Sequence, residues 1–104
     1  MEDIQFVTLA DAAMNDFMDR LGALDPDEVD ADLAQGVLKM EFGAGGVCVM
    51  NRQTAAHQIW LAEGATAWHF GWDGSEWLDT KGRGSLSAVV NEILSRRLGR
   101  PITL

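Results

Sequence analysis

Residues 29–79 contain about six short segments in which apolar and polar residues alternate, separated by turn signals. Alternation is typical of strands with one buried face, because successive side chains of a strand point to opposite sides. The segments are 29–33, 38–42, 47–50, 58–62, 68–72 and 76–79. Short connections, among them the strong hairpin signal Asp73-Gly74, favour antiparallel neighbours. The sequence therefore predicts an antiparallel meander of about six strands.

Amphipathic helices are predicted on both sides of these strands. Residues 4–21 carry apolar side chains at three- and four-residue steps: Phe6, Leu9, Ala10, Ala13, Phe17 and Leu21. Asp3 is the expected N-cap and Gly22 the expected C′ residue. After the N-cap Ser85, a second stripe comprises Leu86, Val89, Val90, Ile93, Leu94 and Leu98. Gly99 and Pro101 end this second helix.

The order of these elements constrains the fold class. Each helix has one apolar stripe, and the sheet needs one covered face. The expected fold is α+β, a two-layer α/β sandwich with the N- and C-terminal helices packed on the same sheet face. The length fits a single domain over residues 1–104. The other sheet face is then open to water, as antiparallel sheets permit.

The stretch 51–62, NRQTAAHQIWLA, places a tryptophan opposite an aliphatic pair. Ile59 and Leu61 share the face beneath the helices, and Trp60 stands on the open face. An exposed tryptophan beside amide and guanidinium groups is typical of a protein-binding hot spot. Alternatively, Trp60 packs against Arg or Met side chains of that face and contacts no partner. The candidate partner-binding residues are Asn51, Arg52, Gln53, Gln58 and Trp60.

The net charge of −8 is concentrated in the first half of the chain. Residues 1–50 hold eleven acids and two bases, whereas residues 51–104 hold five acids and six bases. This field argues against nucleic acid and favours cations or a basic protein surface, unless it serves only solubility. No apolar run approaches ~20 residues, and the N-terminus MEDIQF lacks the features of a signal peptide. We expect a cytoplasmic protein without membrane contact.

The remaining motifs favour structural interpretations. Cys48 is the single cysteine, which excludes an internal disulfide, and its apolar surroundings predict a small buried side chain. His57 and His69 are expected on different strands without a carboxylate at ligand spacing, which favours surface roles over a metal site. The segment DPDEVDAD lacks the glycine and glutamate of a calcium loop, and GRG at 82–84 is expected to be a turn rather than a phosphate cradle.

Taken together, the motifs resemble the frataxins of the bacterial type over essentially the whole chain. They are Asn51-Arg52-Gln53, the block 57–62 (HQIWLA), Trp68-His69-Phe70 and the run 73–77 (DGSEW). The resemblance implies an α/β sandwich and a role in iron–sulfur cluster assembly. It also implies weak iron binding on an acidic ridge of the first helix and first strand. Binding to the complex of cysteine desulfurase and cluster scaffold, with modulation of its rate, is implied as well.

The acidic ridge that the resemblance implies is rich in carboxylates. Its candidate metal ligands are Asp11, Asp16, Asp19, Asp25, Asp27, Glu28, Asp30 and Asp32. Carboxylate oxygens suit iron (Fe2+ or Fe3+) and other hard divalent cations. Because no histidine or cysteine lies in the ridge, we expect weak, exposed and unselective binding. Gly22 and Ala23 stand where relatives often carry acids, so the ridge also suits docking to a basic patch on the desulfurase.

Three functions are compatible with these features. The first is an iron-binding accessory protein, a regulator or iron chaperone of cluster assembly. The second is a metal-independent acidic adaptor that docks on the desulfurase and modulates it. The third is a ferroxidase, which an exposed ridge disfavours because paired irons are held in buried sites. A monomer is expected, with an iron-dependent oligomer as the alternative, and the sequence leaves activation or inhibition of the desulfurase open.

Overall fold

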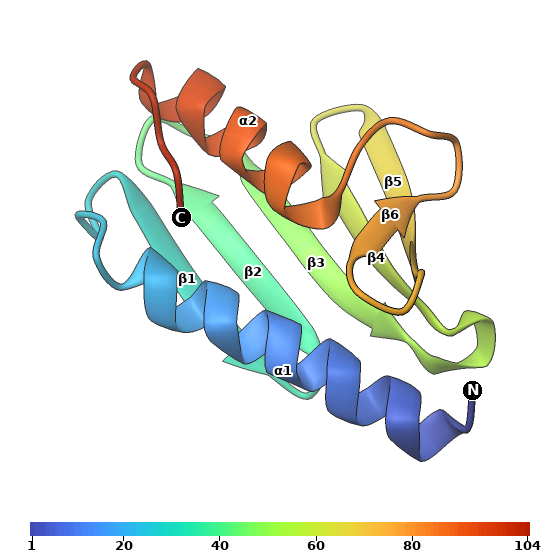
Figure 1. The fold of residues 1–104 in the computed structure, drawn as a ribbon. Helices are drawn as coiled ribbons and strands as arrows, with labels where there is room; N and C mark the ends of the chain where they lie inside the picture. The colour runs from blue at the N-terminus through green and yellow to red at the C-terminus, as the bar shows by residue number, and fades with distance from the viewer.

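The computed structural model describes all 104 residues and contains one sheet covered by two helices (Figure 1). The helices are α1 (Asp3–Leu21) and α2 (Leu86–Leu98), and a short 3-10 helix η1 spans Thr54–Ala56. The strands are β1 (Val29–Ala34), β2 (Val37–Phe42), β3 (Val47–Gln53), β4 (Gln58–Glu63), β5 (Thr66–Trp72) and β6 (Trp77–Asp79). They are adjacent in chain order, and every neighbouring pair is antiparallel.

Both helices lie on the same face of the sheet, with α1 toward the β1 side (Figure 1). This arrangement confirms the predicted two-layer sandwich. Ile59 and Leu61 are 0% and 1% exposed beneath the helices, as their alternation predicted. Cys48 is buried on the same side, and desolvation raises the pKa of its thiol to about 12. No helix combines the length and hydropathy needed to span a bilayer.

The ends of α1 differ from the prediction, whereas those of α2 agree with it. Glu2 is the N-cap of α1, and its backbone N–H donates to Oε1 of Gln5 at 3.0 Å, so Asp3 is already helical. Gly22 keeps a right-handed φ of −63° because the last turn tightens before the chain leaves the helix. In α2, the Ser85 hydroxyl accepts the Ala88 N–H and Gly99 is left-handed with a φ of 72°.

The C-terminal residues return over the sheet between the two helices (Figure 1). The Ile102 N–H donates to Oγ of Ser95 at 2.8 Å, and the Leu104 N–H donates to Oδ1 of Asn91 at 3.0 Å. The Ile102 side chain is only 9% exposed and belongs to the core. The tail therefore closes the core between α1 and α2.

Deleting residues 102–104 is expected to lower the free energy of unfolding by about 4 kcal/mol. Burial of one isoleucine contributes roughly 1.5–3 kcal/mol and each lost hydrogen bond about 1 kcal/mol. Urea denaturation followed by circular dichroism measures the change, with the exposed Thr103→Ala variant as the control. An unchanged denaturation midpoint for the deletion would show that the tail does not close the core.

Candidate functional site

Trp60 lies on the open face of the sheet, whereas its neighbours Ile59 and Leu61 in β4 lie on the covered face, as predicted. Its cross-strand neighbours are Asn51 of β3 and His69 of β5. The indole is half-buried and does not project freely. Its Nε1–H donates to Oε1 of Gln58 at 2.8 Å, and its ring stacks on the His69 ring with centroids 4.2 Å apart and planes at 10°.

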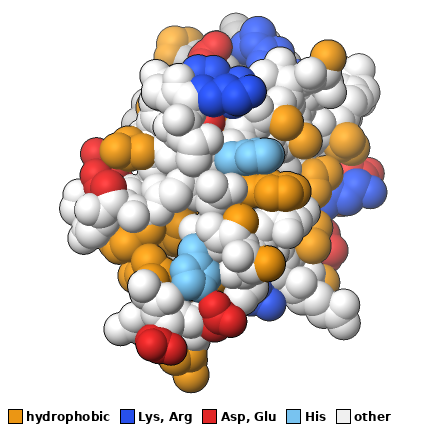
Figure 2. Space-filling view, turned by 90° about the vertical axis from the view of Figure 1, so that its right-hand side faces the viewer, with side chains coloured by type: hydrophobic (Ala, Val, Ile, Leu, Met, Phe, Trp, Pro, Cys, Tyr) orange, Lys and Arg blue, Asp and Glu red, His pale blue; other side chains and the backbone are white.

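A small cavity of about 130 Å³ lies beside this stacked pair. Its lining includes the small or aliphatic side chains of Val49, Ala62 and Ala67. In Figure 2 a pale-blue histidine ring lies flat against an orange hydrophobic side chain, with further orange groups beside it. The same sheet face also exposes Val37 and Val47, at 39% and 43%. The centre of the open face is thus apolar.

Arg52 does not belong to this face, which corrects the expectation that it lies near Trp60. Strand β3 continues to Gln53, so its side chains alternate where a turn was expected. Arg52 therefore points to the helix side of the sheet, as does its cross-strand neighbour Ile59. It forms an ion pair with Asp11 of α1. A Cβ on Gly36 would lie 3.0 Å from the Arg52 guanidinium carbon, so only glycine leaves this group its full space.

The polar candidates that remain on the open face are amides. Asn51, Gln53 and Gln58 alternate with helix-facing residues and share the side of Trp60. Nε2 of Gln53 lies 3.4 Å from Oδ1 of Asn51, a long hydrogen bond. The structure thus brings together four of the five predicted partner-binding residues and separates Arg52 from them.

Three of the eight predicted metal-binding acids are held by arginines. The pairs are Asp11 with Arg52, Asp16 with Arg20, and Glu28 with Arg100. The hydrogen bonds from Arg100 lower the pKa of the Glu28 carboxyl. A cation that bound these three carboxylates would have to compete with a guanidinium already in place.

The other five acids have no ion-pair partner. Oδ1 of Asp25 accepts the Asp27 N–H at 2.9 Å and so closes the turn before β1. Asp19, Asp27, Asp30 and Asp32 are exposed.

These acids lie along one edge of the molecule. Asp30 lines a cavity of about 170 Å³ together with Met18 and Leu21 of α1, so the end of α1 and the start of β1 are adjacent. Glu41 of β2 lies directly opposite Asp30 and adds a carboxylate that sequence reasoning missed. No three histidine, cysteine or acidic side chains converge as they do in a metal cage. The edge offers dispersed carboxylates on the surface.

His57 does have a carboxylate neighbour, contrary to the expectation from spacing. It ends η1 in a left-handed conformation and does not lie in a strand. Its Nε2 lies 2.6 Å from Oδ1 of Asp3, and its ring stacks on Phe6 with centroids 5.3 Å apart. These contacts join the β3–β4 connection to the first turn of α1.

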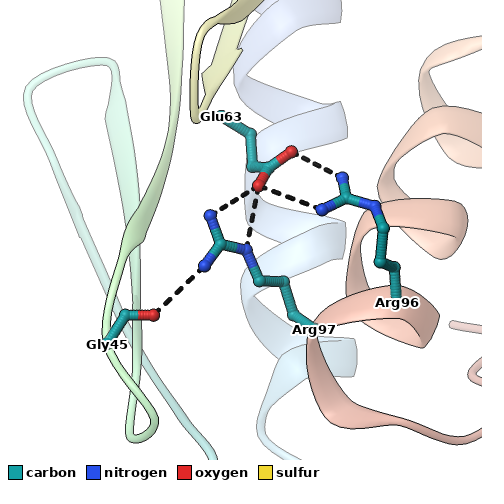
Figure 3. Close-up of polar contacts among 4 residues, drawn as sticks. All are labelled: Gly45, Glu63, Arg96 and Arg97. Carbon is teal, nitrogen blue, oxygen red and sulfur yellow. Dashed lines mark hydrogen bonds and ion pairs between the residues drawn. The ribbon is translucent and has the colours of Figure 1, made fainter.

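Sequence reasoning also missed a buried carboxylate at the end of β4 (Figure 3). The Glu63 side chain is 5% exposed and lies between Arg96 and Arg97 of α2. Nη2 of Arg96 is 2.6 Å from its Oε1, and Nη2 of Arg97 is 2.6 Å from its Oε2. Arg97 also donates to the Gly45 carbonyl at 3.2 Å. The two-residue step from Leu61 was the signal that Glu63 faces inward.

The GRG segment at 82–84 is a turn organised by Asp79, which agrees with the prediction. The Asp79 side chain is fully buried and accepts the Lys81 N–H at 3.2 Å, the Arg83 N–H at 3.0 Å and Nε–H of Arg83 at 2.8 Å. Hydrogen bonds from Arg83 lower the pKa of this carboxyl to about 2, from an ordinary value of 3.8.

Asp79 should make stability depend on pH in acid. Because its folded-state pKa is depressed, its contribution is present above the unfolded pKa near 3.8 and is lost as pH falls through about 2. One proton corresponds to a slope of at most about 1.4 kcal/mol per pH unit. Urea denaturation across this window should show a smaller slope for Asp79→Asn than for the parent chain. An equal slope in both proteins would contradict the assignment of this pH dependence to Asp79. The control is Asp19→Asn, because the Asp19 carboxylate has no ion-pair partner.

These features define a small two-layer α/β sandwich that presents an open sheet face with an apolar centre and an acidic edge. A family model described as the Frataxin-like domain matches residues 1–100, and the chain belongs to this family. Two relatives named iron-sulfur cluster assembly protein CyaY are 37% identical (Thioalkalivibrio sulfidiphilus) and 36% identical (Dechloromonas aromatica). The alignments cover all of this chain and 100% and 99% of theirs.

Solved structures share the fold. Frataxin from Psychromonas ingrahamii aligns with a TM-score of 0.90 at 22% identity, covering 99% of this chain and 97% of its own. Trimeric frataxin from the yeast Saccharomyces cerevisiae, described as complexed with ferrous, aligns with a TM-score of 0.78 at 27% identity. That alignment covers 96% of this chain and 88% of the yeast chain.

Proposed function

We propose that this chain is a cytoplasmic accessory protein of iron–sulfur cluster assembly. It binds the complex of cysteine desulfurase and cluster scaffold, modulates its rate, and carries iron as weakly held cargo. The observation that carries the proposal is the half-buried Trp60 on the open face of a frataxin-like sandwich. The names of the bacterial relatives and the description of the yeast structure support the pathway and the metal.

The open face has the composition of a protein-binding surface. Trp60 lies among the amides of Asn51, Gln53 and Gln58, and Val37 and Val47 are exposed on the same side. Hot spots combine a large aromatic side chain with surrounding groups that exclude water. We assign this face to contact with the complex of cysteine desulfurase and cluster scaffold.

The acidic edge suits a basic surface of the desulfurase or a hard cation. Asp19, Asp27, Asp30 and Asp32 are exposed and have no ion-pair partner. Their oxygens are suitable iron ligands, and their dispersal favours weak binding at several positions. The net charge of −8 opposes self-association, so the working form is proposed to be a monomer that iron could neutralise and bring together. The same dispersal supports the second candidate, a metal-independent acidic adaptor.

Desulfurase activity with and without this chain, across an anaerobic Fe2+ titration, tests the proposal. If Fe2+ changes the effect of the chain on the desulfurase rate and the same concentration of Mg2+ does not, the result supports an iron-responsive regulator. A change in rate that survives chelation supports the metal-independent adaptor. If the chain neither binds the complex nor changes its rate, the proposal is wrong.

Reversing charge on the edge should weaken binding to the desulfurase. The variant with Asp19→Lys and Asp30→Lys is expected to lose roughly tenfold in affinity at low salt. The reversal weakens both the electrostatic steering of association and the charge complementarity of the bound surfaces. The control with Glu76→Lys and Glu92→Lys makes the same change in charge on other exposed positions. Isothermal calorimetry at two salt concentrations measures both variants. Equal losses in both would indicate a non-specific charge effect and count against the edge.

A further inference from the structure

The indole of Trp60 is held by two neighbours on the open face. Its Nε1–H donates to Oε1 of Gln58 at 2.8 Å, and one side of its ring is covered by His69 at a centroid distance of 4.2 Å. The planes of the two rings differ by only 10°, so the stack is nearly parallel. Side chains on an uncovered sheet face otherwise sample several rotamers. These contacts select one orientation.

The strand register produces this arrangement. His69 lies directly opposite Trp60 in the antiparallel pair of β4 and β5, where cross-strand side chains approach each other closely enough to stack. Gln58 precedes Trp60 by two residues and shares its face. The residue opposite Gln58 is Gly71, which carries no side chain. The register therefore leaves Gln58 and His69 as the two side chains that hold the indole.

We propose that His69 is a positioning residue that fixes the Trp60 indole against the sheet before a partner binds. This inference rests on the proposed docking function of the open face and adds the residue that prepares it. With the ring held beside His69, the cavity of about 130 Å³ along Val49, Ala62 and Ala67 stays open for an apolar side chain of the partner. Ordering the indole in advance removes part of the entropy lost on association.

The free protein tests the positioning without any partner. Four tryptophans give indole N–H resonances, and Trp60→Phe identifies the one of interest. His69→Ala should shift this resonance and speed its hydrogen exchange, whereas His69→Phe, which keeps a stacking ring, should preserve its slow exchange. Leu78→Ala, on the same face but opposite Gly71, serves as the control. An indole N–H that is unaffected by His69→Ala would overturn the inference.

A double-mutant cycle with the desulfurase–scaffold complex tests the consequence for binding. His69→Ala should weaken affinity by roughly three- to tenfold, and His69→Phe should recover most of the loss. In a chain that already carries Trp60→Ala, His69→Ala should add nothing, because His69 acts through the indole. Additive effects would overturn the positioning role and make His69 an independent contact. If Trp60→Ala leaves affinity unchanged, the docking assignment fails, and the resonance in the free protein still decides the positioning.

Discussion

Replacing Glu63 with glutamine is expected to lower the free energy of unfolding by about 3 kcal/mol. Its carboxylate is 5% exposed and accepts hydrogen bonds from both Arg96 and Arg97, which lower its pKa. Removing one partner of a buried ion pair leaves uncompensated charge and typically costs 3–5 kcal/mol. The lower end applies because Arg96 is 54% exposed and can turn to water. Urea denaturation with an unchanged m-value would measure this loss.

The same network allows a sharper test of the cause. Glu92→Gln, on the exposed side of α2, removes an equal charge and should change stability by less than about 0.5 kcal/mol. Replacing Glu63, Arg96 and Arg97 together with apolar residues should recover part of the loss, because a buried ion pair contributes little beyond an apolar pair of similar volume. A loss below about 1 kcal/mol for Glu63→Gln would show that water already solvates the carboxylate.

The fold was predictable from the sequence because its signals are local. Alternation with a period of two placed Ile59 and Leu61 beneath the helices and Trp60 on the other face. The apolar stripes of both helices required cover, and one sheet face supplies it. Errors occurred where an element ended, as at Asp3 and Gly22, because neighbouring residues compete for the cap.

The candidate sites depend on registers and long-range pairs, which spacing does not reveal. Arg52 reaches Asp11 across 41 residues, and Arg100 reaches Glu28 across 72 residues. Each pair involves one of the acids predicted to bind metal, and the spacing of residues along the chain gave no sign that these carboxylates are paired. His69 was visible in the WHF motif, but its place against Trp60 follows only from the β4–β5 register.

Replacing Trp60 with alanine is expected to weaken binding to the desulfurase–scaffold complex by about 30-fold or more while leaving the fold intact. A hot-spot aromatic contributes at least ~2 kcal/mol, which corresponds to this factor. The cost in stability should stay near 1 kcal/mol, because the indole is only half-buried and lies outside the core between sheet and helices. Calorimetry of the complex and a thermal melt of the free protein measure the two quantities.

The expected separation of binding from stability depends on which side of β4 carries the change. Ile59→Ala, one residue away on the covered side, should lose roughly 2–5 kcal/mol of stability, because it opens a cavity in the core. Where the variant is still folded, the open face of β4 is intact and affinity should remain close to that of the parent chain. If Trp60→Ala instead lowers the melting temperature as much as Ile59→Ala, the indole supports the fold and the open face has another function. Reduced affinity in both variants would mean that binding depends on the conformation of the whole β4 strand rather than on the Trp60 side chain.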